Sequence, residues 1–305
     1  MQRYNTYRPY IKEKLGYRVN KLSVDMGFTC PNRDGNLAVG GCVYCNNDSF
    51  VPPYARARFS MDQQITNGME YLRNRFKAEK FIIYFQSYTN TYDSVDKLEQ
   101  MYKEALAYDD VVGLAVGTRS DCIDEEKLDM FEELAKDYYV CVEYGIESIY
   151  DKTLDYMNRG HDYQSVLDAI EMSKGRGVEI GAHVIVGMPT ETKEEMLKMA
   201  DEVSSLGIDV FKVHNLHIVR NTQLARMYKE KPFQLFTFQE YVTFIVDFLE
   251  RISPDMIIER LFTDTPHQLL IAPDWGKSHL QILQAIEAEL EKRDTYQGRL
   301  YQKSA

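Results

Sequence analysis

Short runs of β-branched, aromatic and other apolar residues recur along the chain, and amphipathic stretches separate them. Six of these runs predict strands, at residues 19–25, 80–86, 111–117, 139–145, 178–186 and 208–214. Because the runs are apolar almost throughout, they are typical of a parallel sheet that is covered on both faces. The alternation of strands and helices therefore predicts an α/β fold, a partial (β/α)6 parallel barrel.

The stretches between the strands carry signals for the ends of helices. Asp93 and Asp124 are predicted to cap the helices that follow them. Thr192 and Glu195 have the spacing of a capping box, and Gly207 is expected to end that helix. These signals support the alternation of helix and strand.

The C-terminal stretch differs from the rest, because residues 236–252 and 278–293 predict amphipathic helices around an irregular segment at 259–277. This segment is either a substrate lid or part of the packing at the barrel rim. Its notable residues are Asp264, His267, Asp274 and Trp275. No Pro/Gly-rich linker marks a boundary, so we expect an N-terminal arm at 1–16, a core at 17–257 and a C-terminal extension at 258–305.

Charge is distributed unevenly over the 305 residues, whose formal net charge is -11. Residues 1–21 carry six basic side chains against Glu13 alone, which gives +5 there and leaves -16 for the remainder. Two interpretations stay open: a solvated charged arm, or a basic N-terminal arm that contacts nucleic-acid phosphates. The basic residues are Arg3, Arg8, Lys12, Lys14, Arg18 and Lys21.

The number of cysteines, and the absence of an apolar leader or a long apolar run, indicate where in the cell the protein is expected. The first residues are polar and aromatic, and the sequence predicts neither a signal peptide nor a membrane partner. Five cysteines, an odd number, argue against a disulfide framework. We therefore expect a cytoplasmic protein whose reduced thiols are available for metal.

Three of the cysteines form the most specific motif, because Cys30, Cys42 and Cys45 directly follow the first predicted strand. A structural zinc site needs four ligands, and the loop offers no fourth Cys or His. Three thiolates on a [4Fe–4S] cluster leave one iron open, and the amine and carboxylate of S-adenosylmethionine (SAM) fit that position. The spacing favours iron–sulfur but leaves zinc with a remote fourth ligand, or no metal, as alternatives.

Polar residues follow each of the six predicted strands. Functional groups gather at the carboxyl ends of strands in parallel barrels, so this position predicts a site there. The cysteines follow the first strand. The residues at the ends of the other five are, in order, Gln86 and Ser87 for the second strand, Thr118, Arg119 and Asp121 for the third, Glu147 and Ser148 for the fourth, Gly187 and Glu191 for the fifth, and His214 and His217 for the sixth.

Seven segments resemble the radical SAM superfamily, and most closely its YhcC-like branch, which is related to the catalytic subunit of elongator and to oxygen-independent coproporphyrinogen oxidase. The resemblance covers nearly the whole chain. The segments are CPNRDGNLAVGGCVYC, YFQSYTNTY, GTRSD, EYGIES, MNRGH, HVIVGMPTET and RDTYQGR.

The resemblance implies that Cys30, Cys42 and Cys45 bind a [4Fe–4S] cluster and that SAM is the second cofactor. Tyr44 would pack near the SAM adenine, Glu147 would lie at the cofactor, and Arg159 would reach the SAM carboxylate. His183 stands where relatives often carry an Asp, so a ribose contact there is open. The set of expected SAM contacts is Tyr44, Gln86, Ser87, Thr118, Glu147, Arg159 and His183.

Each residue also has a structural interpretation. Glu147 could be an ion-pair partner and Arg159 a helix cap. His214 and His217 are by default core histidines, and either could contact substrate if it faces the pocket. Cys122 and Cys141 are expected to be small buried side chains.

Two departures from the family pattern qualify the resemblance. Most of the superfamily has a glycine-rich segment after the second strand, where this chain reads Phe85-Gln86-Ser87-Tyr88. The chain also stops where elongator-like proteins continue into an acetyltransferase domain, so acetyl transfer is not expected.

The resemblance to elongator and the basic arm lead to the hypothesis that the substrate is tRNA, modified at a carbon substituent on C5 of the wobble uridine. An electron donor such as flavodoxin or ferredoxin is the other expected partner. The alternatives are radical SAM chemistry on a small molecule such as a porphyrin, and a zinc-stabilised binding protein.

Overall fold

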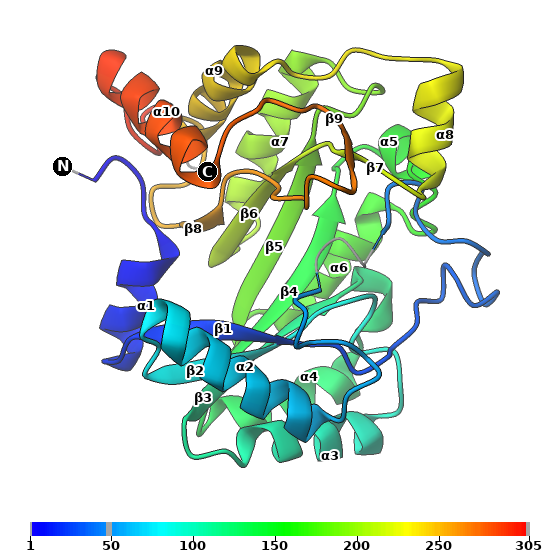
Figure 1. Cartoon of the computed structure of the whole chain (residues 1–305), viewed down its shortest axis with the longest axis vertical. Helices are drawn as coiled ribbons and strands as arrows, with labels where there is room; N and C mark the ends of the chain where they lie inside the picture. Colours follow the sequence, from blue (N-terminus) through cyan, green and yellow to red (C-terminus); the bar gives the residue numbers. More distant parts are fainter. Residues whose placement is uncertain (1, 47–50, 303–305) are drawn as a thin grey trace.

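The computed structural model describes residues 2–46 and 51–302, and its centre is a curved parallel sheet (Figure 1). The strand order is β1-β2-β3-β4-β5-β6-β8, with parallel pairing throughout. The strands are β1 (Val19–Val24), β2 (Lys80–Phe85), β3 (Val111–Thr118), β4 (Tyr139–Glu147), β5 (Glu179–Val186), β6 (Val210–Asn215) and β8 (Ile257–Arg260). The predicted partial parallel barrel is confirmed, and all six predicted strands are present.

The seventh strand, β8, was not predicted from the sequence. It is short, and two of its four residues, Glu259 and Arg260, are charged, so it lacks the apolar run of a buried strand. A second small sheet pairs β7 (Ile218–Val219) with β9 (Leu270–Ala272) in antiparallel fashion. This pairing holds the segment after β8 over the ends of the main strands (Figure 1).

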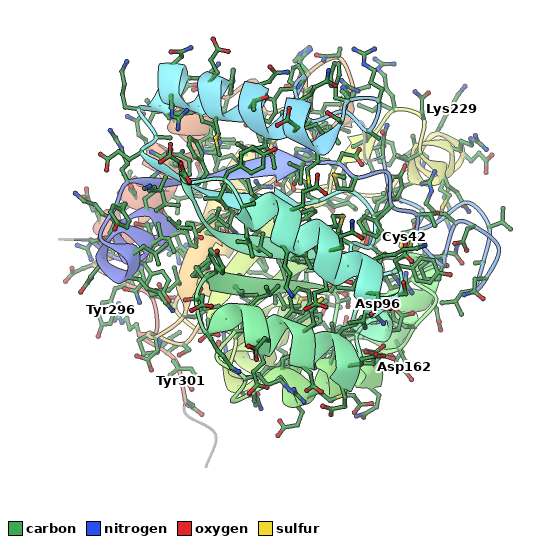
Figure 2. All side chains as sticks on the ribbon, turned by 90° about the horizontal axis from the view of Figure 1, so that it is seen from below. Cys42, Asp96, Asp162, Lys229, Tyr296 and Tyr301 are labelled. Atoms are coloured by element: carbon green, nitrogen blue, oxygen red, sulfur yellow. The ribbon has the colours of Figure 1, made fainter. Side chains whose placement is uncertain are left out.

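Helices cover the outer face of the sheet, and the main hydrophobic core lies between the two layers (Figures 1 and 2). In β2, for example, Phe81, Ile83 and Phe85 belong to this core, whereas Ile82 and Tyr84 face the inside of the barrel. Alternating side chains of a strand point to opposite faces, so each strand presents one side to this core and the other side to the inside of the barrel, where Ile82 and Ala115 belong to a smaller apolar cluster. The helices are α1 (Tyr7–Leu15), α2 (Met61–Phe76), α3 (Val95–Leu106), α4 (Glu125–Ala135), α5 (Asp151–Tyr156), α6 (Tyr163–Ser173), α7 (Lys193–Ser205), α8 (Gln223–Glu230), α9 (Phe238–Leu249) and α10 (His279–Lys292).

Most of the predicted helix ends are confirmed. Asp124 accepts a hydrogen bond from the Lys127 backbone N–H, and Thr192 and Glu195 form a capping box. The prediction for Asp93 was wrong, since Ser94 is the residue at the N-cap of α3. The Asp93 carboxylate instead accepts from the Ser94 backbone N–H and pairs with Lys97, so it lies one residue too early to cap the helix.

The N-terminal segment packs against the body of the protein, at the end opposite the cysteines (Figure 2). Helix α1 contacts β1 and β8 at the base of the barrel. Arg3 forms an ion pair with Asp294 at 3.1 Å, and Lys14 pairs with Glu179. Lys21 is also buried in an ion pair. Three of the six basic residues counted from the sequence thus form ion pairs within the protein.

The two amphipathic helices expected near the C-terminus are present as α9 and α10, which pack against each other, with β8 and β9 between them in the sequence. Within the described residues, no helix is long and apolar enough to span a membrane. The expected boundaries at 1–16, 17–257 and 258–305 remain predictions, and residue 1 and residues 303–305 lie outside the described part of the chain.

Candidate functional site

The ten residues expected from the sequence to bind the cluster and SAM all line one cavity of about 880 Å³. The cavity lies inside the barrel and opens at the carboxyl ends of the strands. Its walls come from every strand of the main sheet, so closing the sheet into a half-barrel is what brings the residues together. The ten are Cys30, Cys42, Tyr44, Cys45, Gln86, Ser87, Thr118, Glu147, Arg159 and His183.

The three cysteines are held by the loop that follows β1. Cys30 and Cys42 are buried and Cys45 is half-buried. Backbone hydrogen bonds fix the loop: the Arg33 N–H donates to the Cys30 carbonyl at 2.8 Å, and the Cys45 N–H donates to the Cys42 carbonyl at 3.0 Å. Gly41 has a φ of +82°, and an added Cβ would lie 2.8 Å from the Arg33 side chain, so only glycine fits this turn.

Arg119 is fixed against Cys30 by the carboxylate of Asp121. Its Nε and Nη2 donate to the two carboxylate oxygens of Asp121, both at 2.8 Å. Its Nη1 donates to the Arg159 carbonyl at 2.8 Å and lies 3.9 Å from the Cys30 sulfur. The bidentate pair holds the guanidinium in one orientation, with a positive edge towards the thiol.

The other two sulfurs also face nitrogen donors. Arg159 Nη1 lies 3.7 Å and Asn32 Nδ2 lies 3.6 Å from the Cys42 sulfur. Arg33 Nη1 lies 4.0 Å from the Cys45 sulfur. The four side chains Asn32, Arg33, Arg119 and Arg159, here called the donor ring, thus place N–H groups and positive charge around all three cysteines.

This environment fits thiolates that are bound to a metal centre. Burial, followed by the nearby Cys42, raises the pKa of the Cys45 thiol to about 12, so without a metal this thiol stays protonated. A bound cluster needs the thiolate form, and the cations of the donor ring favour negative charge on sulfur. The residues present therefore fit an iron–sulfur cluster.

A closed zinc site, the alternative left by the motif, requires four ligands around one ion. Among residues 2–46 and 51–302, no group of three or more His, Cys, Asp and Glu side chains is placed to hold a single metal ion. The same finding holds for Cys30, Cys42 and Cys45 as ligands of one ion, and metal analysis is the test that separates zinc from iron–sulfur.

Glu147 and His183 form a pair beside the donor ring. Glu147 Oε1 lies 3.3 Å from His183 Nε2 and 3.8 Å from Arg159 Nη2. Burial raises the pKa of the Glu147 carboxyl, but the charges of His183 and Arg159 outweigh this effect and lower the pKa to about 2. Burial lowers the pKa of His183, whereas Glu147 and Glu143 raise it to about 9. The pair is therefore charged at neutral pH.

Backbone geometry around this pair leaves no room for larger residues. Glu147 itself has a φ of +64°, which is unusual for a residue other than glycine, and it lies at a register shift between β4 and β5. A Cβ on Gly145 would come within 2.8 Å of both Arg159 Nη2 and Glu147 Oε1. The missing side chain at Gly145 lets the arginine and the carboxylate meet at the cavity wall.

The segment after β2 adopts a glycine-like backbone without glycines. Ser87 and Tyr88 have φ values of +86° and +62°. This left-handed region is the one that glycine occupies easily. The chain thus departs from the family in sequence at this point, while its backbone torsions are ones that a glycine-rich segment would also favour.

A charged network at the floor of the cavity was missed by the sequence analysis. Lys212 Nζ donates to both carboxylate oxygens of Glu143 at 2.7 Å, and Tyr84 Oη donates to Glu143 at 2.7 Å. Lys21 pairs with Glu259, whose carboxylate also lies 3.4 Å from Lys212 Nζ. These five residues are here called the floor network.

The floor network had a signal in the sequence. Glu143 and Lys212 stand in the middle of otherwise apolar strands, where a charge is costly unless the side chain faces a partner inside the barrel. Burial raises the pKa of Glu143, but Lys212 and Lys21 outweigh it and hold the pKa well below its usual range. Glu143 is therefore anionic. Burial lowers the pKa of Lys21, but Glu259 outweighs this effect and the pKa stands well above its usual range, whereas burial lowers the pKa of Lys212.

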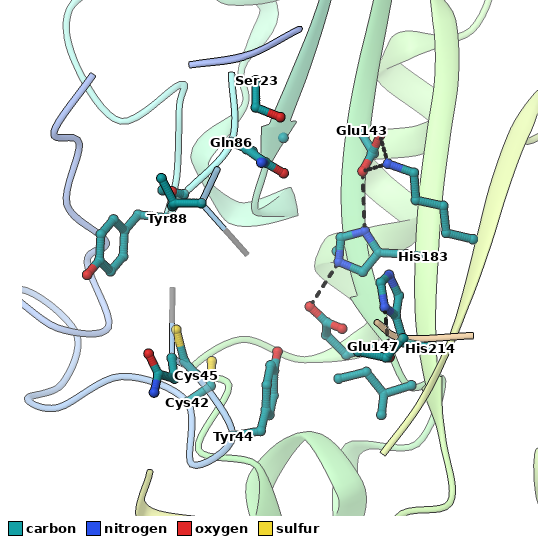
Figure 3. Close-up of a pocket in the computed structure, with 18 of the residues that line it drawn as sticks. Ser23, Cys42, Tyr44, Cys45, Gln86, Tyr88, Glu143, Glu147, His183 and His214 are labelled. Atoms are coloured by element: carbon teal, nitrogen blue, oxygen red, sulfur yellow. Dashed lines mark hydrogen bonds and ion pairs between the residues drawn. The ribbon is translucent and has the colours of Figure 1, made fainter. Parts of the chain in front are cut away.

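The remaining expected contacts are found in definite positions. Tyr44 stands between Cys42 and Glu147 in Figure 3. Thr118 is buried and shares a hydrogen bond of 2.5 Å with Thr91. Cys122 and Cys141 are small buried side chains, as predicted.

His214 near the end of β6 and His217 just after this strand both line the cavity. His214 Nδ1 lies 3.1 Å from Thr263 Oγ1, and His217 Nδ1 lies 2.9 Å from Thr265 Oγ1. Burial lowers the pKa of both, for His217 to about 4, so both rings are neutral at physiological pH. Both histidines face the pocket, as a substrate contact would, and both have a hydrogen-bond partner, as a structural histidine would. Each of the two interpretations from the sequence is thus met in part.

For the segment after β8, the sequence left open a substrate lid or packing at the barrel rim, and each interpretation fits one part of the segment. Asp264 lines the cavity. Trp275 packs against Tyr241 of α9, with ring centroids 5.0 Å apart, and donates its indole N–H to the Phe236 carbonyl. His267 is mostly exposed and lies 3.4 Å from Asp274. One end of the segment thus borders the site, and the other end is packed on the rim.

The fold and the cavity together define a class: a parallel half-barrel protein with a cysteine-lined site at the carboxyl ends of its strands. Comparison with protein families agrees. Residues 29–203 match the radical SAM superfamily, and residues 208–292 match the radical SAM C-terminal domain. The chain belongs to the radical SAM superfamily, whose members bind a [4Fe–4S] cluster and SAM.

Individual relatives agree with the branch that the sequence motifs indicated. The chain is 34% identical to protein YhcC of Escherichia coli over 89% of this chain and 87% of that protein. It is 24% identical to the tRNA uridine(34) acetyltransferase of Methanocaldococcus jannaschii over 52% of this chain and 30% of that protein. The structure of Elp3 from Methanocaldococcus infernus superposes with a TM-score of 0.69 at 20% identity, covering 92% of this chain and 64% of that one, which shows a shared fold.

Proposed function

We propose that Cys30, Cys42 and Cys45 bind a [4Fe–4S] cluster with one open iron, and that the protein uses it to cleave SAM and modify the wobble uridine of a tRNA. The observation that carries this proposal is the convergence of the three cysteines, the donor ring and the Glu147–His183 pair on one cavity. When bound, the cluster and SAM would supply an electron and a 5′-deoxyadenosyl radical.

The residues of the chain would position SAM and keep water away from the radical. The buried Nε of Arg159 has no hydrogen-bond partner among the described residues, so it can donate to the SAM carboxylate. Tyr44 would pack on the adenine. Glu147 and His183 form a charged wall that can bind the ribose hydroxyls or the SAM amine, and Gln86, Ser87 and Thr118 would complete the contacts from β2 and β3.

The tRNA substrate is supported by relatives rather than by a contact in the structure. The tRNA uridine(34) acetyltransferase resembles about half of this chain. The cavity of about 880 Å³ is large enough for a small-molecule cofactor together with part of a nucleotide. An extruded uridine would enter through the mouth, and the reaction would remodel its substituent at C5.

The reaction class can be tested without knowledge of the substrate. Protein reconstituted anaerobically with iron and sulfide is incubated with dithionite and SAM, and 5′-deoxyadenosine is quantified by mass spectrometry. We expect its formation in the intact protein. A reconstituted cluster that forms no 5′-deoxyadenosine would contradict the proposed cleavage.

The tRNA substrate requires a separate test. The gene is deleted in the source organism, and digested tRNA nucleosides are profiled by mass spectrometry. We expect one wobble uridine derivative to disappear and a precursor with a different C5 substituent to accumulate. An unchanged nucleoside profile would exclude this substrate.

The two alternatives receive less support. Porphyrin chemistry requires a deep apolar pocket, whereas the floor of this cavity is built from paired Lys and Glu side chains. A zinc-stabilised binding protein would bind about one zinc without acid-labile sulfide, which metal analysis would reveal. A natural electron donor of the flavodoxin or ferredoxin type is part of the proposal, because the cluster must be reduced before SAM is cleaved.

A further inference from the structure

We propose that the ring of Tyr88, backed by the guanidinium of Arg33, forms a stacking platform for an unpaired RNA base at the mouth of the cavity. This inference rests on the proposed tRNA substrate and names the surface that receives it. It assigns the RNA contact to the mouth of the barrel, not to the N-terminal arm.

The backbone at Tyr88 is the first observation. Ser87 and Tyr88 are consecutive residues with positive φ, a conformation that is rare for a bulky aromatic side chain. Strain of this kind persists where the surrounding structure requires it, often at a functional site. Its result here is a tyrosine ring that lines the cavity while remaining 36% exposed to solvent.

Arg33 supports the ring. The guanidinium carbon of Arg33 lies 5.1 Å from the centroid of the Tyr88 ring, and its Nη1 lies 4.0 Å from the Cys45 sulfur. A flat cation beside an exposed aromatic ring is a surface on which nucleobases stack. Since the same guanidinium contacts a cysteine of the cluster loop, a base on this platform would lie next to the reaction centre.

The position of Tyr88 in the cavity fits a neighbouring base and not the reacting one. In Figure 3, Tyr88 lies across the cavity from Glu143 and His183, on the side of the cluster loop. Single-stranded RNA loops are recognised by splaying out their bases and stacking them on aromatic rings. We infer that one base of the anticodon loop stacks at Tyr88 while the target uridine extends inward between the cysteines and the floor network.

Charge near the mouth fits an RNA backbone despite the overall negative charge. Helix α8 and the residue after it expose Arg226, Lys229 and Lys231, with Glu230 the acidic residue in that stretch. The Leu224 N–H donates to the Val43 carbonyl at 2.8 Å, so this helix is joined to the cluster loop. Figure 2 shows Lys229 and Cys42 at the same end of the molecule. Phosphates that flank the stacked base would meet these cations.

The N-terminal arm is less suited to this contact. It packs at the base of the barrel, and Arg3, Lys14 and Lys21 are paired with carboxylates of the protein. An RNA bound there would have to displace these ion pairs and would lie far from the mouth. Arg8, Lys12 and Arg18 remain exposed, and they provide a direct comparison.

The test uses fluorescence anisotropy to measure how tightly the reconstituted protein, without SAM, binds an unmodified tRNA transcript with a uridine at the wobble position. Tyr88→Gly removes the ring and suits the positive φ, whereas Tyr88→Phe keeps the ring. Tyr138→Ala is the matched control, because Tyr138 is 37% exposed but lies before β4 at the opposite end of the strands. A triple variant, Arg8→Ala, Lys12→Ala and Arg18→Ala, tests the arm. Iron content and circular dichroism verify the fold of each variant.

We expect Tyr88→Gly to raise the Kd about tenfold or more, as the loss of one stacked base implies. Tyr88→Phe and Tyr138→Ala should stay within about twofold of wild type. The slope of log Kd against log salt should be unchanged in Tyr88→Gly, because no phosphate contact is lost. Wild-type affinity in Tyr88→Gly, or a larger loss in the arm variant, would overturn the platform while leaving the tRNA substrate intact. If the wild-type protein does not bind the transcript, the proposed substrate fails and this inference fails with it.

Discussion

The floor and the mouth of the cavity satisfy their charged side chains in different ways. At the floor, Lys212 and Glu143 pair through two hydrogen bonds of 2.7 Å. At the mouth, donors point at thiol sulfurs over 3.6 to 4.0 Å, and the buried Nε of Arg159 has no partner among the described residues. The floor is complete within the chain, whereas the mouth is arranged for groups that the chain itself does not supply.

Removal of a thiol from the mouth is expected to have the largest effect. Cys42→Ala should reduce bound iron from about four atoms per chain to background and abolish 5′-deoxyadenosine formation, because two thiolates do not hold the cluster. Iron and sulfide analysis after anaerobic reconstitution measures the effect. Cys122→Ala is the control, since Cys122 is buried outside the motif and should keep full iron content.

The second test breaks the floor. Glu143→Gln leaves the buried lysines without their carboxylate and should lower the free energy of unfolding by about 3–5 kcal/mol. Urea denaturation followed by circular dichroism measures it. The same substitution at Glu133, which forms an exposed pair with Lys136, should change this free energy by less than about 1 kcal/mol. Equal effects at both positions would show that the floor network adds nothing beyond a surface ion pair.

The third test measures how stability depends on pH through the Glu147–His183 pair, which lies between the floor and the mouth of the cavity. The pKa of His183 is raised to about 9, so its contribution to stability is complete below the unfolded value of about 6.5 and is lost as pH rises through 9. The pKa of Glu147 is lowered to about 2, so its contribution is lost as pH falls from about 4.5 through 2.

Between pH 6.5 and 9, the unfolding free energy of the wild type should fall by about 2 kcal/mol as His183 loses its proton. The His183→Gln variant should not show this fall. Urea unfolding at several pH values in both proteins provides the difference. Parallel pH curves for the wild type and the variant would contradict the assigned pair.

The smallest expected effect concerns the donor ring. Arg119→Met removes a positive N–H group that lies 3.9 Å from the Cys30 sulfur, and should shift the midpoint potential of the cluster to more negative values. A redox titration followed by electron paramagnetic resonance measures the shift. Arg176→Met should leave the potential unchanged, because Arg176 follows α6 and pairs with the exposed carboxylates of Glu125 and Asp129 in α4.

Local patterns were sufficient for most of the fold. The six long strands were predicted because each is a continuous apolar run, while β8 was missed because only Ile257 and Ile258 are apolar in it. Capping at Asp124 followed from chemistry within one turn. At Asp93 the sequence offered two adjacent capping residues, and only the backbone decides for Ser94.

The site was predicted as far as its residues belong to motifs. The cysteines, Glu147 and Arg159 stand in recognisable segments, and all of them line the cavity. The floor network could not be paired from the sequence, because Glu143 and Lys212 are 69 residues apart and meet only when the sheet curves. The positive φ at Tyr88 left no local signal, because tyrosine is not a residue that favours it.

The central claim is that three cysteines leave one iron of a cluster open for SAM. The most direct measurement is the electron paramagnetic resonance spectrum of the dithionite-reduced, reconstituted protein before and after SAM is added. We expect the signal of a reduced [4Fe–4S] cluster whose line shape changes when SAM binds to the open iron. A cluster signal that SAM leaves unchanged, or protein that takes up zinc without sulfide, would contradict it.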